Sequence, residues 1–399
     1  MDKKKKLAIV ITHPIQYHAP LYKVINKAGL FDLHVIYRDD RGVRPFFDQF
    51  SKSYVSYDNN LLGGYSYEFL TKGEPKNIFE KIYRFLLPSL EKSIIASGAD
   101  AVYFHGYNYL PYIRAIFRLR RKGIKIFLRG ENEDVLGRPP LKNFLRELLL
   151  KILLPRIDAI LYIGIENKNF FLRRGVPEEK LFFVPYSVDN EYFGINMPSK
   201  EKELIREKIC EEYKIPLDSV IFINTCKHRI EKSPIDTVRG FIKAFEGLER
   251  SEERRAHLVL VGDGPLNAEM RAIVKESGLS NVTFTGYVNQ SKLRELMMAS
   301  DYMINSGAEP WGCTLNEALP VGLGIISSDL VVGYPDMVRQ GENGFVYKFG
   351  DISGLSSDIK KCIENKNFIK KFSLVSKEIA REYSYENCVV GLNKAISAN

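Results

Sequence analysis

The sequence lacks any long hydrophobic run. No segment approaches the ~20 consecutive apolar residues that a membrane-spanning helix needs. The apolar run Leu7–Ile11 is short and breaks at Thr12-His13-Pro14, so it predicts a first β-strand rather than a signal peptide. We therefore expect a cytoplasmic protein without a membrane-spanning helix.

Residues that build metal sites are sparse and scattered. The five cysteines are odd in number and form no Cys-x-x-Cys pair, which predicts a reducing compartment. The six histidines make no His-Glu-x-x-His motif, and Asp39-Asp40 is not a spaced acidic pair. The acidic residues of 131–134 form one cluster with no second set of ligands. We expect neither a metal ion nor a cofactor.

The positive charge is unevenly distributed. Residues 1–190 hold 31 basic and 20 acidic residues, a net charge of +11, whereas the rest holds 27 and 29, a net charge of −2. A basic half suggests an anionic partner, which could be a membrane surface, a phospholipid-linked substrate or nucleic acid. The densest basic residues are Arg114, Arg118, Arg120, Arg121, Lys122, Lys125 and Arg129.

Strand-like and helix-like segments alternate in both halves of the chain. With 399 residues, the chain exceeds the usual size of one hydrophobic core, so two domains are expected. Alternation of strands and helices predicts an α/β fold with parallel sheets. We expect one domain over residues 1–198, joined by a C-terminal helix within 384–399, and a second over residues 199–383. The expected strands are 7–11, 33–37, 101–104, 124–128, 159–163, 220–224, 257–261, 282–285, 302–305 and 324–328. The expected helices are 110–121, 141–153, 234–245, 266–276, 291–299 and 314–319.

Two glutamates, Glu309 and Glu317, lie eight positions apart around the turn Trp311-Gly312-Cys313. A strand precedes them, and the turn leads into an expected helix. Free backbone N–H groups at a helix start favour anions, and carboxylates accept hydrogen bonds from hydroxyl groups. A segment that offers both suits a ligand that combines phosphate with sugar. The alternative is a surface acid followed by an acid in a first helical turn.

Two further loops follow expected strands of the second half. The first, 225–234, carries Lys227, Arg229 and Lys232, which could neutralise a diphosphate leaving group or could simply be solvated. The second, Gly262-Asp263-Gly264-Pro265, allows a tight turn or a close ligand approach. It lacks the spacing of dinucleotide and P-loop fingerprints.

In the first half, His13 and His105 follow expected strands, where a parallel sheet often faces its ligand. A histidine in such a place is as readily a hydrogen-bonded structural group as an active one. We take His105 as a catalytic candidate.

These motifs together resemble glycosyltransferase family 4, retaining enzymes of the GT-B fold with two Rossmann-like domains. The resemblance covers about residues 215–390 and includes Val282–Val288, Ala299-Ser300-Asp301 and Asn343-Gly344-Phe345, besides the segments above. The start Thr12-His13-Pro14-Ile15-Gln16-Tyr17 and Arg129-Gly130-Glu131 resemble a bacterial subset of that family.

The resemblance implies a role for each motif. Lys227 and Lys232 would neutralise the donor diphosphate, Glu309 would hold donor-sugar hydroxyls, and Glu317 would accept from the ribose hydroxyls. The amides that would meet sugar and phosphate are those of Gly312, Cys313, Thr314 and Leu315. The residues that would border the base are Gly262, Gly264, Tyr287 and Val288. Enzymes of this family need no metal, and the leaving phosphate is thought to take the acceptor proton.

The sequence departs from the family pattern in three places. Lys227 stands where Arg is usual, so Arg229 could share its task. His13-Pro14 replaces a Gly-rich loop. Pro320 follows Leu319, so the helix there should be short or kinked after Leu319.

The sequence therefore predicts a hexosyltransferase that moves a sugar, with retention, from a UDP-sugar or GDP-sugar to a polysaccharide or lipid-linked acceptor. The basic first half would bind the acceptor, and the amphipathic stretch 141–151 could lie on the inner face of the plasma membrane or pack on the sheet. An epimerase or phosphorylase on the same scaffold would instead use His105, Glu131 or His13 as acid and base. A non-catalytic nucleic-acid or scaffold protein would not need both glutamates, and we expect no nucleic-acid partner.

Overall fold

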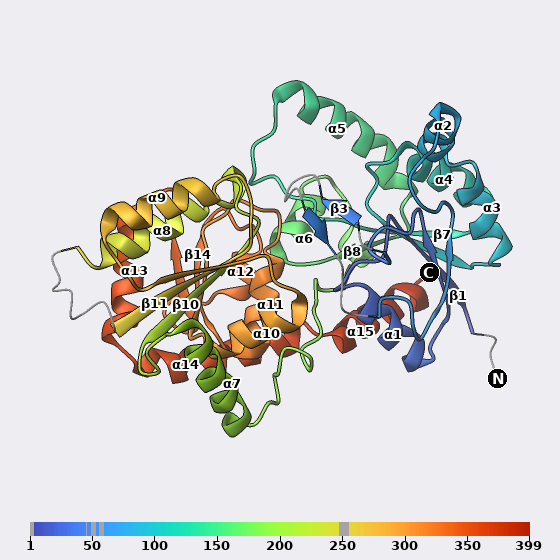
Figure 1. Cartoon of the computed structure of the whole chain (residues 1–399). Helices are drawn as coiled ribbons and strands as arrows, with labels where there is room; N and C mark the ends of the chain where they lie inside the picture. Colours follow the sequence, from blue (N-terminus) through green and yellow to red (C-terminus); the bar gives the residue numbers. More distant parts are fainter. Residues whose placement is uncertain (1–3, 45, 49–52, 56–59, 247–254) are drawn as a thin grey trace. The chain divides into compact units, whose positions relative to one another are not determined.

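The structure is a computed structural model that describes residues 4–44, 46–48, 53–55, 60–246 and 255–399. The chain divides into two compact units, each built around a parallel sheet (Figure 1). Unit 1 comprises Met1–Phe46, Val55–Val188 and Ser384–Asn399, and unit 2 comprises Phe47–Tyr54 and Asp189–Tyr383. None of the helices in the described residues is long and apolar enough to span a membrane.

Unit 1 is built on a seven-stranded sheet of order β5-β2-β1-β6-β7-β8-β9, in which every pair is parallel. Its strands are β1 (Lys6–Ile11), β2 (Asp32–Tyr37), β5 (Ser66–Phe69), β6 (Ala101–His105), β7 (Lys125–Arg129), β8 (Ala159–Tyr162) and β9 (Leu181–Phe183). Its helices are α1 (Ala19–Ala28), α2 (Ile78–Leu86), α3 (Ser89–Ala96), α4 (Leu110–Arg120), α5 (Pro140–Leu153), α6 (Ile165–Leu172) and α15 (Tyr385–Ser397), with short 3₁₀ turns at Leu154–Arg156 and Glu178–Lys180.

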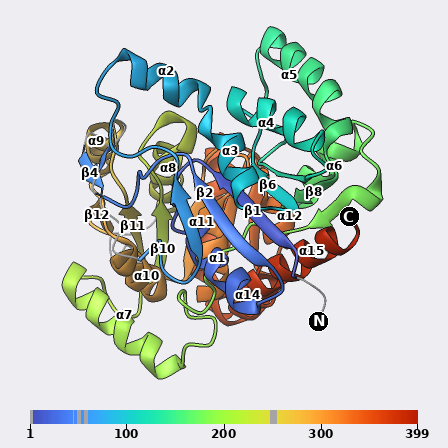
Figure 2. The same ribbon diagram turned by 90° about the vertical axis from the view of Figure 1, so that its right-hand side faces the viewer.

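Side chains of β1 alternate between the two faces of this sheet, as a buried parallel strand requires. Leu7 and Ile9 belong to a core that includes residues of α1 and α15. Ala8 and Val10 belong to a second core that includes residues of α3 and α4. The C-terminal helix α15 therefore packs within unit 1, against α1, β8 and β9 (Figure 2).

Unit 2 is built on a six-stranded parallel sheet of order β12-β11-β10-β13-β14-β15. Its strands are β10 (Val220–Thr225), β11 (Ala256–Val261), β12 (Val282–Gly286), β13 (Tyr302–Asn305), β14 (Gly324–Ser328) and β15 (Gly344–Tyr347). Its helices are α7 (Ser199–Tyr213), α8 (Pro234–Ala244), α9 (Asn267–Ser277), α10 (Gln290–Ala299), α11 (Cys313–Val321), α12 (Tyr334–Met337), α13 (Ile352–Glu364) and α14 (Asn367–Glu382), with a 3₁₀ turn at Ile230–Lys232. A separate two-stranded sheet pairs β3 (Phe46–Asp48) with β4 (Ser53–Val55).

The predicted fold class, two Rossmann-like α/β units, is confirmed. The secondary structure of two segments differs from what the sequence pattern predicts. The charged segment Ser199–Tyr213, whose start shows little apolar periodicity, forms α7, held by the Arg206–Asp301 ion pair. Helix α11 continues past Leu319 through Pro320 to Val321 and ends at Gly322, whose φ of +82° only glycine adopts readily.

Candidate active site

The loops that follow the strands of unit 2 are joined to one another by hydrogen bonds. The sheet is parallel, so the carboxyl ends of β10 to β14 lie along one edge. The joining bonds run from Cys226 N to Val261 O, from Gly262 N to Gly286 O, from Ala308 N to Glu231 O and from Ser328 Oγ to Gly307 O. The segments that the sequence singled out in this half thus form one continuous surface at the carboxyl edge.

Lys232 and Glu309 form the central ion pair of this edge, with Lys232 Nζ 2.5 Å from Glu309 Oε2. The Glu309 side chain is only 14% exposed. Its second oxygen, Oε1, accepts a hydrogen bond of 2.7 Å from Asn305 Nδ2. Asn305 is the last residue of β13, and Lys232 ends the 3₁₀ turn after β10. The two neighbouring strands therefore hold the predicted lysine and glutamate together.

Asn305 also links this pair to the first turn of α11. Its Nδ2 lies 3.2 Å from Thr314 Oγ1, and its Oδ1 accepts the Gly307 N–H. The sequence reasoning did not single out Asn305. One sequence feature could have indicated its role: Asn305 is a polar amide at the end of an apolar strand, directly before the Glu309 segment.

Helix α11 begins at the turn that the sequence predicted. Gly312 caps it with a φ of +104°, and no side chain of the described residues caps the helix start. A Cβ at Gly312 would lie 2.6 Å from Val331 Cγ1, so the turn admits no side chain there. Buried Trp311 fixes the turn by donating from Nε1 to Asn316 Oδ1. The N–H groups and positive dipole end at Cys313 and Thr314 thus lie beside Glu309, where an anion would be stabilised.

Glu317 lies one helical turn after Thr314 and is half-buried. Within the described part of the chain, no residue donates a hydrogen bond to its carboxylate or forms an ion pair with it. Burial raises the pKa of Glu317 to about 7. A carboxylate in this condition gains from a ligand that supplies hydroxyl donors.

The two other predicted cations lie in the loop after β10. Lys227 is exposed, and its carbonyl accepts the Arg229 N–H. The Arg229 guanidinium is 2.7 Å from Glu231 Oε1. This ion pair neutralises part of the charge that Arg229 would bring to a diphosphate.

Close contacts with the backbone of the neighbouring loop require glycine at Gly262 and Gly264. Their φ angles are +132° and +158°, and a Cβ on them would lie 1.9 Å from Cys226 O and 2.5 Å from His228 O. The two glycines let the loop after β11 lie directly on the backbone of the loop after β10. Next along the edge, Tyr287 is exposed and Val288 half-buried, just after Gly286 at the end of β12.

Cys226 offers a thiol near the central ion pair, with Sγ 3.2 Å from Asn224 Oδ1. Burial raises the pKa of this thiol to about 12, so it stays protonated at neutral pH. It is unsuited to act as a nucleophile, because the thiolate is the reactive form.

His105 lies in unit 1, at the end of β6, within a cluster of aromatic rings. Its Nε2 is 2.9 Å from Tyr22 Oη, and its ring stacks on Tyr103 with centroids 4.5 Å apart. The His18 ring lies 4.5 Å away. Burial, reinforced by the nearby Arg129 cation, holds the pKa of His105 well below its usual range. At neutral pH the imidazole is therefore uncharged.

His13 and Glu131 are the other acid and base candidates that an epimerase would need. His13 is half-buried, with Nδ1 2.9 Å from Thr12 Oγ1, and burial lowers its pKa. Glu131 is exposed. Among the described residues, no group of three His, Cys, Asp or Glu side chains is arranged to hold a metal ion.

A protein-family model matches the part of the chain that forms this edge. The model of the family described as Glycosyl transferases group 1 matches residues 212–379. This range contains every candidate residue of unit 2. Residues 212–379 form a group 1 glycosyltransferase domain. The enzyme is accordingly a glycosyltransferase.

The glycosyltransferase has relatives that match both halves. It is 23% identical over 350 residues to an uncharacterised glycosyltransferase of Methanocaldococcus jannaschii, across 85% of this chain and 84% of that protein. It is 26% identical over 260 residues to the GalNAc-α-(1→4)-GalNAc-α-(1→3)-diNAcBac-PP-undecaprenol α-1,4-N-acetyl-D-galactosaminyltransferase of Campylobacter jejuni, across 65% of this chain and 64% of that protein.

Solved structures show the same fold. Anabaena HepE in complex with UDP and glucose superposes with a TM-score of 0.70 and 14% identity, over 99% of this chain and 100% of that one. The lipopolysaccharide outer core galactosyltransferase WaaB, in its apo form, gives a TM-score of 0.65 and 16% identity, over 98% and 99% of the two chains. The glycosyltransferase thus has two Rossmann-like domains of the GT-B class.

Proposed function

We propose that this glycosyltransferase belongs to family 4 and transfers a hexosyl group, with retention of configuration, from a nucleoside diphosphate sugar to a polysaccharide or lipid-linked glycan. The observation that carries the proposal is the contact network of Lys232, Glu309, Asn305 and Thr314 at the start of α11. It combines fixed positive charge, hydroxyl-accepting oxygen and helix N–H groups in one place.

Each part of a donor has a counterpart along the carboxyl edge. Lys232 and the α11 N-terminus would stabilise the diphosphate as negative charge develops on it. With the ligand bound, the Glu309 carboxylate would exchange its ion pair with Lys232 for hydrogen bonds donated by hydroxyl groups of the sugar. Glu317, one turn along the helix, would accept from the ribose hydroxyls, and Tyr287 and Val288 would border the base.

The proposed mechanism depends on position and charge rather than on a protein nucleophile. Cys226 remains a thiol at neutral pH, and Glu309 is already bonded to Lys232 and Asn305. The leaving phosphate would therefore take the proton of the acceptor hydroxyl while the new bond forms on the same face of the sugar. Because the chain supplies the cations, transfer should continue in EDTA.

The names of the relatives suggest which donor and acceptor classes to test first. HepE was solved with UDP and glucose, and the Campylobacter jejuni relative acts on an undecaprenol-linked glycan. We propose a UDP-sugar as the first donor to test, a GDP-sugar as the second, and a glycan acceptor at the inner face of a bacterial plasma membrane.

A thermal-shift screen tests the donor assignment. A ligand that binds only the folded protein raises its melting temperature. UDP or GDP should raise it in the wild type, and less in Lys232→Ala. No shift with either nucleotide would overturn the donor site. NMR of the product anomer, with and without acceptor, then separates retaining transfer from epimerisation.

A further inference from the structure

Lys232 and Glu309, the two charged groups proposed to hold the donor, are paired with each other in this structure. Lys232 Nζ lies 2.5 Å from Glu309 Oε2, and the two side chains are 29% and 14% exposed. The same ammonium would bind the diphosphate, and the same carboxylate would bind the sugar. A diphosphate that enters the site therefore competes with Glu309 for Lys232.

Arg229, the second cation of the same loop, is also paired with a carboxylate. Its guanidinium is 2.7 Å from Glu231 Oε1. The Glu231 carbonyl accepts the Ala308 N–H, which ties this loop to the Glu309 segment. Both cations thus have carboxylates of the site itself as counter-ions, so a diphosphate meets two neutralised pairs.

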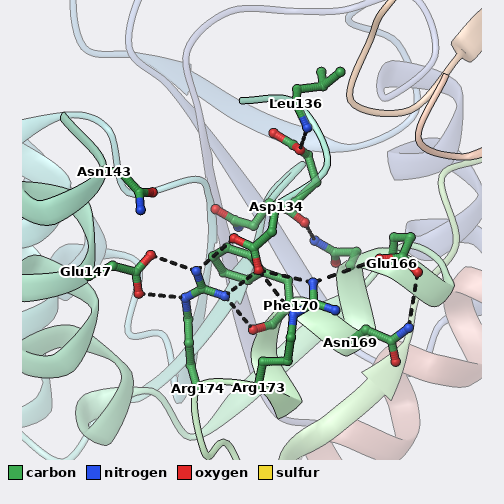
Figure 3. Close-up of polar contacts among 12 residues, drawn as sticks. Asp134, Leu136, Asn143, Glu147, Glu166, Asn169, Phe170, Arg173 and Arg174 are labelled. Atoms are coloured by element: carbon green, nitrogen blue, oxygen red, sulfur yellow. Dashed lines mark hydrogen bonds and ion pairs between the residues drawn. The ribbon is translucent and has the colours of Figure 1, made fainter. Parts of the chain in front are cut away.

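A network of ion pairs in unit 1 shows how a permanent arrangement differs (Figure 3). There Arg174 binds Glu147 through Nε and Nη2, at 3.0 and 2.6 Å, and also binds Asp134. Two further arginines contact the same aspartate. By contrast, Lys232 and Glu309 have no other ion-pair partner among the residues that the structure describes. A ligand can therefore exchange this pair by displacing a single contact.

An intact nucleotide sugar brings a new partner for each member of the pair. Its diphosphate would bind Lys232, and its sugar hydroxyls would donate to Glu309. A free nucleoside diphosphate brings only the first of these partners. The largely buried Glu309 carboxylate would then keep the Asn305 hydrogen bond alone, beside an anionic phosphate, which disfavours binding.

The three N–H donors of Lys232 do not remove this competition. If the ammonium bound phosphate and Glu309 at once, the two anionic oxygens would lie within about 5 Å of each other. Their repulsion would still weaken the binding of the diphosphate. Sugar hydroxyls between the two anions are what relieves it.

We propose that the Lys232–Glu309 ion pair makes the donor site select an intact nucleotide sugar over the free nucleoside diphosphate, and that it displaces this product after transfer. Transfer breaks the bond from the anomeric carbon to the diphosphate oxygen and forms the bond to the acceptor oxygen, and the diphosphate takes the acceptor proton. Once the sugar has left with the acceptor, Glu309 pairs with Lys232 again and the nucleotide dissociates. Resting on the proposed function, this role of Glu309 concerns product release as well as the sugar.

Calorimetric titration of the full chain with UDP and GDP tests the proposal. The nucleotide that binds the wild type should bind Glu309→Gln on the order of tenfold more tightly, and Lys232→Ala more weakly. Glutamine keeps an oxygen that accepts from Asn305 but lacks the charge that pairs with Lys232. Glu295→Gln is the matched control, because it removes a carboxylate 2.8 Å from Lys208 on the surface, and it should bind as the wild type does.

A double-mutant cycle separates release of Lys232 from a general change of charge. In the Lys232→Ala background, Glu309→Gln should change nucleotide affinity by no more than about threefold, because no cation remains for it to release. Equal tightening in both backgrounds, or an unchanged affinity in Glu309→Gln, would overturn this proposal and leave the donor site in place. If none of the variants bound either nucleotide, the donor site and this proposal would fail together. Melting temperatures without nucleotide show that each variant is folded.

Discussion

Asn305 Nδ2 donates a hydrogen bond of 2.7 Å to Glu309 Oε1, and the same amide group lies 3.2 Å from Thr314 Oγ1. One buried side chain thereby orients both the carboxylate and the first turn of α11. Asn305 is a positioning residue in this arrangement, since it acts through Glu309 and Thr314.

Asn305→Asp should lower kcat on the order of 100-fold, with a smaller change in the KM of the donor. The new carboxylate cannot donate to Glu309 and repels it. The Asn196→Asp variant is the matched control, because exposed Asn196 donates to Glu191 over 2.8 Å. Steady-state kinetics with thermal melts would check this, and equal kcat in both variants would remove Asn305 from the positioning network.

Lys232→Ala and Glu309→Gln should each lower transfer about 100-fold or more without unfolding the protein, because each removes charge or orientation where the diphosphate and sugar are proposed to bind. Lys208→Ala breaks a surface pair of similar length, 2.8 Å to Glu295, and should leave activity unchanged. Wild-type rates in both site variants would show that the site assignment is wrong.

Glu317 should couple nucleotide binding to proton release. Its pKa in the folded protein is raised to about 7, against about 4.3 in an unfolded chain. Ribose hydroxyls that donate to the carboxylate would lower this pKa, so binding at pH 7 should release up to roughly half a proton. Calorimetry in buffers of different ionisation enthalpy measures the release, and Glu317→Gln should abolish it. Identical release in that variant would assign the proton to another group.

The same shift predicts the stability of the protein without ligand. Because the folded state binds the Glu317 proton more tightly, this group favours folding below about pH 4.3, and its contribution is lost as pH rises through about 7. Denaturant titrations of wild type and Glu317→Gln should therefore give equal stabilities below about pH 4.3, separate as the pH rises from about 4.3 to about 7, and stay apart at higher pH, with the variant the more stable.

Gly262→Ala should destabilise unit 2 by about 2–4 kcal/mol, since its Cβ would collide with Cys226 O at a φ of +132°. Gly341→Ala also has a positive φ but meets open space, so a cost of about 1 kcal/mol is expected there. Chemical denaturation of the two variants gives the comparison. Equal costs would mean that the loops after β10 and β11 separate easily.

The sequence predicted much of the sheet because buried parallel strands are short apolar runs with clear ends. The expected strands at 302–305 and 324–328 match β13 and β14. Segments with weak signals were missed, including β5 at Ser66–Phe69 and β15 at Gly344–Tyr347. Helix α7 was not indicated, because contacts such as Arg206 with Asp301, which are distant in sequence, hold it in place.

The sequence by itself determined the fold class, the transferase motifs and the basic first half. These properties reside in local patterns: apolar periodicity, glycine turns and charge counts. Only the tertiary structure decided that Asn305 joins Glu309 to α11, that Glu231 forms an ion pair with Arg229, and that α2 and α5 expose apolar side chains. Each of these depends on which side of an element meets the rest of its unit, and contacts between residues far apart in the chain set that choice.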